Sequence, residues 1–357
     1  MPLPTKTSSS FAEAMRYVRK NFIFVGAFSC VINILMLTGP IFMLQVYDRV
    51  LSSGSVDTLL ALAVLGGMLY AFMGLLEAIR SRMLAAIGHG FDAKLAGTAF
   101  NEDLAATLQG GPSAVSTKAT ADVGQLRSFF SSPAVAAFFD MPWMPFYLGL
   151  VFALHFWLGI VGLVGAALLI VIAVVSDIVT RRASRDLRAL TAASDQIAQS
   201  SRRNVEAIQG MGMHNEITKL WRRAHDRLLA ASAKSAQLNG VSASITKVVR
   251  LSLQSAALAV GAYLVIENAA TGGVMIAASI IMAKGLQPIE GAMQNWRTVL
   301  AAQRSYRNLK KVFSAPAAQD KISLPRPTSR LDVDRITVLP PAVRKPTLMG
   351  VNFSVEA

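Results

Sequence analysis

The sequence predicts an all-α membrane protein whose six transmembrane helices continue as long cytoplasmic extensions, followed by the first strands of an incomplete α/β domain. Three observations predict this fold class: six apolar stretches, basic residues confined largely to alternate gaps, and polar gaps that favour helix. Of the 35 Lys and Arg residues, 4 precede the first stretch and Arg49 lies alone in the next gap. The following gaps hold 5, none, 13 and none, and the last 12 run from Lys284 onward.

The alternation of basic charge predicts which gaps stay in the cytoplasm. Lys and Arg resist translocation, so both chain ends would be cytoplasmic, and the gaps at 48–57, around His155 and at 267–273 would face outward. A basic soluble protein is the alternative, but a mean hydropathy of +0.45 with 53% apolar residues is hard to bury in a soluble core. The net charge of +14 indicates attraction to anionic membrane lipid and no nucleic-acid partner.

The apolar stretches define the expected membrane spans, since a helix needs only about 20 apolar residues to cross the hydrocarbon. We expect spans at about 22–46, 58–79, 133–154, 157–176, 251–267 and 273–291. The last two are rich in Ala, Gly, Ser and Gln, which favours contact with other helices or a cavity over contact with lipid. Residues 1–20 would form a cytoplasmic segment without a cleavable signal peptide. Cys30 is the only cysteine, so no disulfide within the chain is expected.

The gaps at 80–127 and 177–250 are polar yet rich in helix-forming residues. In the second gap, apolar residues recur mostly three or four positions apart, as in an amphipathic helix. These residues are Ile178, Leu187, Leu190, Ile197, Val205 and Ile208. A helix of about 30 residues would project roughly 45 Å from the membrane. We call these predicted extensions stalks.

Each pair of stalks has to reverse at its tip, and glycines mark the positions. The second reversal is predicted at 209–215, where Gly210 and Gly212 interrupt the helix and two methionines offer adaptable apolar contact. The first is predicted at 109–112, followed by a short helical piece near 117–124. Plain turns in solvent are the alternative, but exposed methionines favour a partner surface.

The chain changes character after the sixth span. A basic helix runs into a linker at 313–330 that is rich in Pro, Ser and charged residues. Two strands are then expected at 334–339 and 350–355, within a segment 331–357. Because two strands cannot fold alone, we expect the chain to stop inside a second domain.

Four segments carry a resemblance to a known family. They are LMLTGPIFMLQVYDRVLSSGS, FFDMPWMPFY, EAIQGMGM and the terminal LMGVNFSVEA. Together they resemble the permease/ATPase subunit of type I secretion systems, the ABC exporters of the protease and RTX-protein secreting branch in Gram-negative bacteria. The likeness covers the whole chain. It implies an ABC type-1 transmembrane domain over 21–312 and the start of a nucleotide-binding domain after the linker.

The resemblance also implies cofactors, partners and location. It implies a homodimer in the bacterial inner membrane, with ATP and magnesium bound by the full-length protein. The implied partners are a periplasmic adaptor, an outer-membrane channel and an unfolded protein substrate with a C-terminal signal. No G-x-x-x-x-G-K-[ST] phosphate loop occurs in these 357 residues, so this chain alone is not expected to hydrolyse ATP. The place where such proteins often carry an adenine-stacking aromatic holds Pro340 or Pro341.

The family's stalk tips dock on the nucleotide-binding domains, which assigns candidate coupling residues by resemblance. The second coupling element would lie around 210–216 and the first around 116–124. The candidates are Gly210, Met211, Gly212, Met213 and His214 in the second and Lys118 and Asp122 in the first.

Asp140 and Lys284 are candidates for the translocation pathway, because ionisable residues inside a membrane usually serve function. Asp140 has a structural alternative, since the prolines at 142 and 145 free backbone groups that need partners. Lys284 could line a cavity for an unfolded polypeptide or extend toward the membrane surface. The four histidines show no metal-ligand spacing, and no catalytic residues are expected.

Two other functions remain open at the level of sequence. One is an ABC exporter of lipid or small molecules, for which neighbouring genes would discriminate. The other is a six-helix membrane module without ATP coupling, which a phosphate loop encoded beyond residue 357 would argue against.

Overall fold

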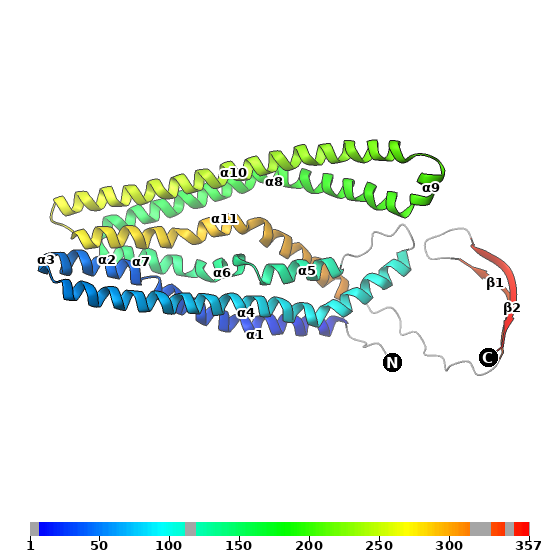
Figure 1. Ribbon diagram of the computed structural model, residues 1–357, viewed down its shortest axis with the longest axis horizontal. Coiled ribbons are helices and arrows are strands. Elements are labelled where there is room, and N and C mark those ends of the chain that lie inside the picture. Colours follow the sequence, from blue (N-terminus) through cyan, green and yellow to red (C-terminus); the bar gives the residue numbers. More distant parts are fainter. Residues whose placement is uncertain (1–6, 111–118, 315–329, 340–345, 357) are drawn as a thin grey trace. The chain divides into compact units, whose positions relative to one another are not determined.

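The computed structural model describes residues 7–110, 119–314, 330–339 and 346–356, most of them in helices (Figure 1). The chain divides into two compact units. Unit 1 comprises Met1–Ile32, Phe72–Phe139 and Asn295–Ala357, and unit 2 comprises Asn33–Ala71 and Asp140–Gln294.

Long helices dominate the described part of the chain (Figure 1). The helices are α1 (Thr7–Leu35), α2 (Thr38–Gln45), the π-helical turn η1 (Val46–Val50), α3 (Leu51–Ser53), α4 (Val56–Gly110), α5 (Ala119–Phe130), α6 (Pro133–Asp140), the 3₁₀ turn η2 (Met141–Trp143), α7 (Met144–Leu154), α8 (Phe156–Arg203), α9 (Val205–Gly210), α10 (His214–Ile266) and α11 (Gly272–Ser314). The strands are β1 (Leu331–Val338) and β2 (Leu348–Val355).

Six helical segments of the described chain are long and apolar enough to cross a membrane. They are Ser10–Ser53, Val56–Ala106, Pro133–Leu154, Phe156–Arg203, His214–Ile266 and Gly272–Ser314. α10 has 53 residues and therefore measures about 80 Å, compared with roughly 30 Å of bilayer hydrocarbon. The predicted fold class, six membrane helices with long helical extensions and two following strands, is confirmed.

Prolines explain where the membrane helices break. α1 ends at Leu35, and α2 begins at Thr38 with Pro40 in its first turn. A proline has no N–H to donate to the carbonyl four residues earlier, and its ring clashes with that carbonyl. Pro40 would meet the carbonyl of Met36 in this way, so the helix is interrupted there. Pro142 and Pro145 similarly accompany the 3₁₀ turn between α6 and α7.

Unit 1 has an aromatic core. Its rings come from α1, α4, α5 and α11, and the pairs include Phe11 with Phe313 at 5.7 Å and Phe91 with Phe130 at 5.1 Å between centroids. Phe91, Leu95 and Leu309 are fully buried in this core. The segment predicted to precede the first span is continuous with it here, because α1 begins at Thr7 and buries Phe11 and neighbouring apolar residues.

Unit 2 packs α7, α8, α10 and α11 around a second apolar core. Tyr147, Leu158, Leu169, Met282 and Leu286 are its largest fully buried side chains. Small residues let the helices approach: a Cβ on Gly261 of α10 would lie 2.5 Å from Cγ of Met275 on α11. The most apolar stretch of α11 is 56% buried within the chain, whereas that of α10 is only 17% buried.

α8 and α10 run side by side and form a pair of stalks (Figure 1). Ala183 and Ser194 of α8 and Ser235 and Thr246 of α10 are buried, so small side chains are covered along this pair. The predicted apolar stripe follows the same face only in part. Leu187, Leu190, Ile197 and Ile208 are half-buried, whereas Ile178 and Val205 are exposed.

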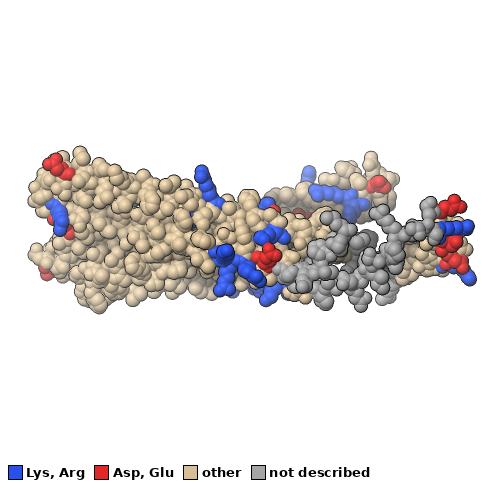
Figure 2. Space-filling view, turned by 90° about the horizontal axis from the view of Figure 1, so that it is seen from below, with Lys and Arg blue, Asp and Glu red and all other residues tan. Residues whose placement is uncertain are grey.

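Large apolar side chains cover the outer faces of the membrane helices. Figure 2 shows a broad surface without acidic or basic side chains. Leu60 and Met68 of α4 and Val164 and Val171 of α8 are each more than half exposed. Lipid is the medium in which such a surface is stable, because water penalises exposed apolar area.

The two strands pair antiparallel, with Leu331 opposite Val355 and Val333 opposite Phe353. Both strands begin a few residues before the predicted positions. Their apolar side chains, including Leu331, Leu348 and Phe353, are about half exposed. The predicted linker lies mostly outside the described residues, as do Pro340 and Pro341.

The close approach of α10 and α11 generates a prediction. Gly261→Ala should destabilise the protein by about 1–3 kcal/mol, because the new methyl group overlaps Met275. Gly149→Ala is the matched control, since no atom lies within 4 Å of its added Cβ and alanine favours helix by roughly 1 kcal/mol. Thermal unfolding of both variants in lipid nanodiscs checks this, and equal midpoints would contradict it.

Candidate functional site

The tip of the α8–α10 pair is a compact turn built around the predicted glycines. α8 ends at Arg203, the short helix α9 follows, and α10 begins at His214. Gly212 N–H donates to the carbonyl of Gln209 at 3.1 Å, and Met213 N–H donates to the carbonyl of Ile208 at 2.9 Å. This pair of bonds is a Schellman motif, which requires a left-handed residue that glycine adopts most easily. Gly212 fills that position with φ 66°.

The five tip candidates, Gly210 to His214, therefore lie together on one turn. Met211 is 65% exposed and Met213 is 39% exposed. Val205, Leu220 and Trp221 nearby in the sequence are also exposed. The ring of Trp221 stacks on that of His225 with centroids 4.6 Å apart. A solvated turn would not gather so many exposed apolar side chains, so the tip has the character of a partner surface.

The sequence prediction missed α9 as a separate helix. The reversal was predicted at 209–215, and the structure adds a short helix at Val205–Gly210 that ends in this turn. Asn204 separates α8 from α9, and its amide donates to the carbonyl of Ser200 at 2.9 Å. An asparagine followed by Val-Glu was the available signal, since Asn is common next to helix starts.

The first tip is only partly within the described residues. Lys118 and the rest of 111–118 lie outside them. Asp122 lies on α5, and its carboxylate accepts hydrogen bonds from Ser305 Oγ at 2.6 Å and Asn308 Nδ2 at 3.3 Å. Its carboxylate therefore joins α5 to α11 inside unit 1.

Asp103 holds the start of α5 and was not predicted. Its Oδ1 accepts from the backbone N–H of Ala119 at 2.8 Å, and its Oδ2 accepts from the N–H of Thr120 at 2.9 Å. A carboxylate satisfies the free N–H groups of a first helical turn and suits the positive end of the helix dipole. Asp103 on α4 thus fixes α5, and with it Asp122.

Asp140 is part of a polar network at the ends of two interrupted helices. Its Oδ1 accepts from Asn33 Nδ2 at 2.7 Å, and Tyr147 Oη donates to the carbonyl of Asn33 at 2.8 Å. Asn33 and Tyr147 are each 2% exposed. Asn33 lies near the end of α1 and Asp140 ends α6, so the network stabilises the places where both helices break. This geometry favours the structural interpretation of Asp140.

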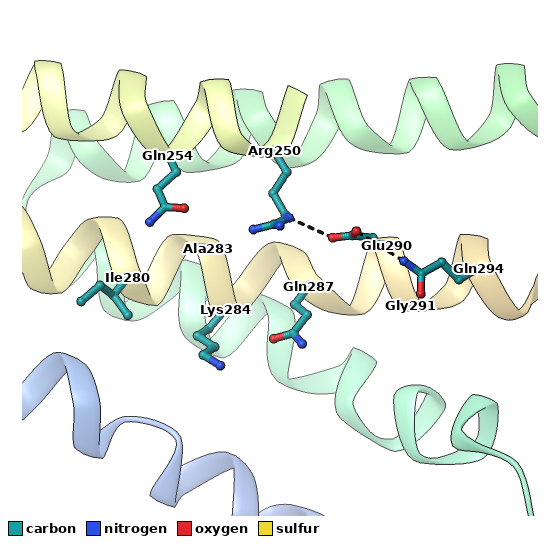
Figure 3. Close-up of a pocket in the computed structure, with 9 residues that line it drawn as sticks. All are labelled: Arg250, Gln254, Ile280, Ala283, Lys284, Gln287, Glu290, Gly291 and Gln294. Atoms are coloured by element: carbon teal, nitrogen blue, oxygen red, sulfur yellow. Dashed lines mark hydrogen bonds and ion pairs between the residues drawn. The ribbon is translucent and has the colours of Figure 1, made fainter. Parts of the chain in front are cut away.

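Lys284 lines a cavity of about 500 Å³ between α10 and α11 (Figure 3). The lining residues are Arg250, Gln254, Ile280, Ala283, Lys284, Gln287, Glu290, Gly291 and Gln294. Arg250 Nε and Glu290 Oε2 form an ion pair at 2.8 Å, with both side chains largely buried. Asp140 is not among the lining residues, so the two predicted pathway residues belong to different places in unit 2.

Asp48 joins the π-helical turn η1 to the start of α11 within unit 2, which the sequence analysis did not predict. Its Oδ2 accepts from Thr271 Oγ1 at 2.8 Å, and its Oδ1 accepts from the backbone N–H of Gly273 at 3.0 Å. The carboxylate therefore caps the start of α11. Gly273 has no room for a side chain, because an added Cβ would lie 2.6 Å from the carboxylate. Among the described residues, no group of three His, Cys, Asp or Glu side chains could hold a metal ion.

Comparison with known proteins identifies what the chain resembles. The family model for the ABC transporter transmembrane region matches residues 22–287. The chain is 37% identical over 347 residues to the type I secretion system ATP-binding protein PrsD of Rhizobium meliloti (strain 1021), covering 97% of this chain and 60% of that protein. The resemblance inferred from the sequence motifs is thereby confirmed.

A solved structure supports the fold. It is a bacterial Atm1-family ABC exporter with ATP bound, which matches 95% of this chain and 62% of its own with a TM-score of 0.70 at 15% identity. The chain thus spans about three fifths of the length of each of these relatives.

Substitutions at Asn33 and Asp140 test the role of the Asp140 network. Asn33→Leu should destabilise the protein by about 1–3 kcal/mol, because it removes the buried amide that donates to half-buried Asp140. Asp140→Asn is the informative partner variant, since its amide oxygen can still accept from Asn33 while the charge is gone. If Asp140 is structural, Asp140→Asn should unfold and transport like the wild type. Loss of transport with unchanged thermal unfolding would instead assign Asp140 to the pathway.

Proposed function

The chain belongs to the family of ABC transporter transmembrane regions, and from this premise we propose that it is the membrane-spanning half of a homodimeric, ATP-driven exporter of unfolded proteins. The observation that carries the proposal is the tip between α9 and α10, an exposed apolar turn at the end of helices that continue into the membrane spans. The 37% identity to a type I secretion protein supports secretion as the task.

ATP and magnesium enter this proposal through a nucleotide-binding domain that works with these helices. These 357 residues contain no phosphate loop. In the proposal, their helices are moved by the ATP-driven closure of that domain. In the proposal, the turn at 211–213 and α9 dock on that domain, as does the element at 116–124 that includes Lys118 and Asp122. Exposed Met211 and Met213 suit a docking surface because methionine adapts its shape to a partner.

In the proposal, the stalks transmit movement from the tip to the membrane spans. α8 and α10 pack against each other on small side chains and continue without a break into the membrane segments. A displacement at the tip therefore moves the membrane ends of the same helices. Closure of paired nucleotide-binding domains would then bias the membrane half toward its other access state.

The membrane setting and the partners follow from the same proposal. Apart from Arg49 and Lys284, the basic residues lie before the first span, in the gaps 80–127 and 177–250, and after the sixth span, which supports an inner-membrane protein with both termini in the cytoplasm. We propose a second copy of the chain, a periplasmic adaptor, an outer-membrane channel and an unfolded substrate with a C-terminal signal as partners. The exposed apolar face of α10 leaves area for a second copy or for lipid.

Deleting the gene tests the proposed function. A distinct set of proteins should disappear from the culture medium and return when an intact copy is supplied, as measured by mass spectrometry of the secreted fraction. An unchanged set of secreted proteins would contradict the proposal. A change confined to exported lipid or small molecules would favour the alternative exporter class.

The tip generates a prediction on coupling. Gly212→Val, placed in the chromosomal gene, should reduce secretion roughly tenfold while ATP hydrolysis in isolated membranes continues, because a β-branched residue at φ 66° is strained by about 1–3 kcal/mol and reshapes the turn. Gly240→Ala is the control, since Gly240 lies within α10 away from the tip, with no atom within 4 Å of an added Cβ. Normal secretion by Gly212→Val would exclude the tip as the coupling element.

A further inference from the structure

We propose that the cavity between α10 and α11 binds a short, extended stretch of polypeptide that carries acidic side chains. This inference rests on the proposed function and names the chemistry that its cargo would present. It begins from the regular placement of the lining residues. Ile280, Lys284, Gln287, Gly291 and Gln294 follow one face of α11 at helical spacing, and Arg250 and Gln254 lie one turn apart on α10.

Uncommitted polar groups gather at this cavity. Within the described residues, the side chains of Gln254, Lys284 and Gln287 make no hydrogen bond or ion pair. All three fall in the predicted spans 251–267 and 273–291. A polar group at membrane depth raises the free energy of the folded protein when it has no hydrogen-bond partner. A ligand bound in the cavity would provide that partner.

The backbone adds a further acceptor at the same place. Pro288 lies inside α11 and has no N–H to donate to the carbonyl of Lys284, one turn earlier. This carbonyl therefore lacks the donor that it would have in a regular α-helix. Lys284 thus contributes an ammonium group and an accessory backbone acceptor to one stretch of the wall.

The charges of the lining predict an anionic partner. The charge of Arg250 is compensated by its ion pair with Glu290. The other carboxylate oxygen of Glu290 accepts a hydrogen bond from Gln294 Nε2 at 3.4 Å. Glu290 is the only acidic residue of the lining. Figure 3 shows Arg250 and Gln254 extending from α10 toward α11, whereas Lys284 and Gln287 extend from the opposite edge of α11. Lys284 therefore leaves one positive charge that the lining does not neutralise.

The shape and polarity of the lining favour a polypeptide over a lipid. From Ile280 to Gln294 the wall measures about 21 Å along α11, which matches about six residues of extended chain. Glutamine amides both donate and accept, as peptide groups do. A lipid would also require an apolar groove for its acyl chains, but only Ile280 and Ala283 among the lining residues have large or aliphatic apolar side chains.

Peptide binding to the 357-residue chain in lipid nanodiscs tests the proposal. The probes are two fluorescein-labelled hexapeptides, one with three Asp residues and the other with three Asn residues at the same positions. Their binding is measured by fluorescence anisotropy. The wild type should prefer the Asp peptide, and this preference should weaken as salt screens the charge. Lys284→Gln should lower affinity for the Asp peptide about tenfold and leave the Asn peptide unchanged.

Two further variants control the experiment. Lys247→Gln removes an exposed lysine of α10 outside the cavity and should change neither affinity. Lys284→Arg keeps the charge and should retain the preference for Asp. Unchanged binding of the Asn peptide also shows that Lys284→Gln keeps its fold.

Several outcomes would overturn the proposal. Equal affinity for the two peptides, or no effect of Lys284→Gln, would show that Lys284 extends to the membrane surface without binding cargo. Lys284-dependent binding of short-chain phosphatidylglycerol that displaces the peptide would assign the cavity to anionic lipid. Failure of the proposed function is separate: if gene deletion abolishes secretion but Lys284→Gln secretes and binds normally, only this inference falls.

Discussion

The absence of water inside a bilayer is the constraint on which the rest of this structure depends. Every backbone N–H and C=O in the hydrocarbon has to be satisfied by the protein, so each membrane segment is a helix and each interruption of a helix needs polar partners. The interruptions near Pro40 and near Pro142 lie on two such helices. The buried network of Asn33, Asp140 and Tyr147 is placed where α1 and α6 end. A carboxylate in this position is explained by packing and hydrogen bonding before any role in transport is invoked.

The need to satisfy every backbone group within the protein no longer applies where the helices extend beyond the membrane into water. Outside the hydrocarbon, α8 and α10 need only a narrow seam, and they form it from Ala183, Ser194, Ser235 and Thr246. Small side chains in a seam allow close packing of two long helices with few rotamers to order. Exposed apolar residues lie along α10, at Leu229 and Val241, and again at the tip, at Met211 and Met213. Two packed helices with an apolar tip are suited to receiving force from a partner. The Schellman turn at Gly212 defines the shape of this tip.

Local patterns were sufficient to predict the spans, the stalks, the glycine turn and the two strands, because hydropathy, helix periodicity and turn residues are properties of neighbouring positions. They were insufficient for the contacts that position the elements. Asp48 meets Gly273 across 225 positions of sequence, and Asp122 meets Ser305 across 183. Asp103 likewise caps a helix that begins 16 positions later. No periodicity encodes such pairs, and a single acidic residue in a polar gap resembles any solvated charge. The short helix α9 was missed for a different reason, since six residues are too few to show a period.

The charged residues within or near the spans differ in how they are compensated, and this difference bears on function. Asp140 accepts from Asn33, and Arg250 pairs with Glu290, so both are accounted for by contacts within the chain. Lys284 has no such contact in the described part of the chain, although it lies on a half-buried face of the most covered membrane helix. Burying a charge without a partner is costly, and a structure keeps it only where something else compensates it. Water, a lipid headgroup or a passing chain could each do so. A passing chain would also bring peptide N–H and C=O groups to the glutamine amides and to the carbonyl of Lys284, which loses its usual helical donor at Pro288. This combination supports the proposal that the cavity makes transient contact with cargo.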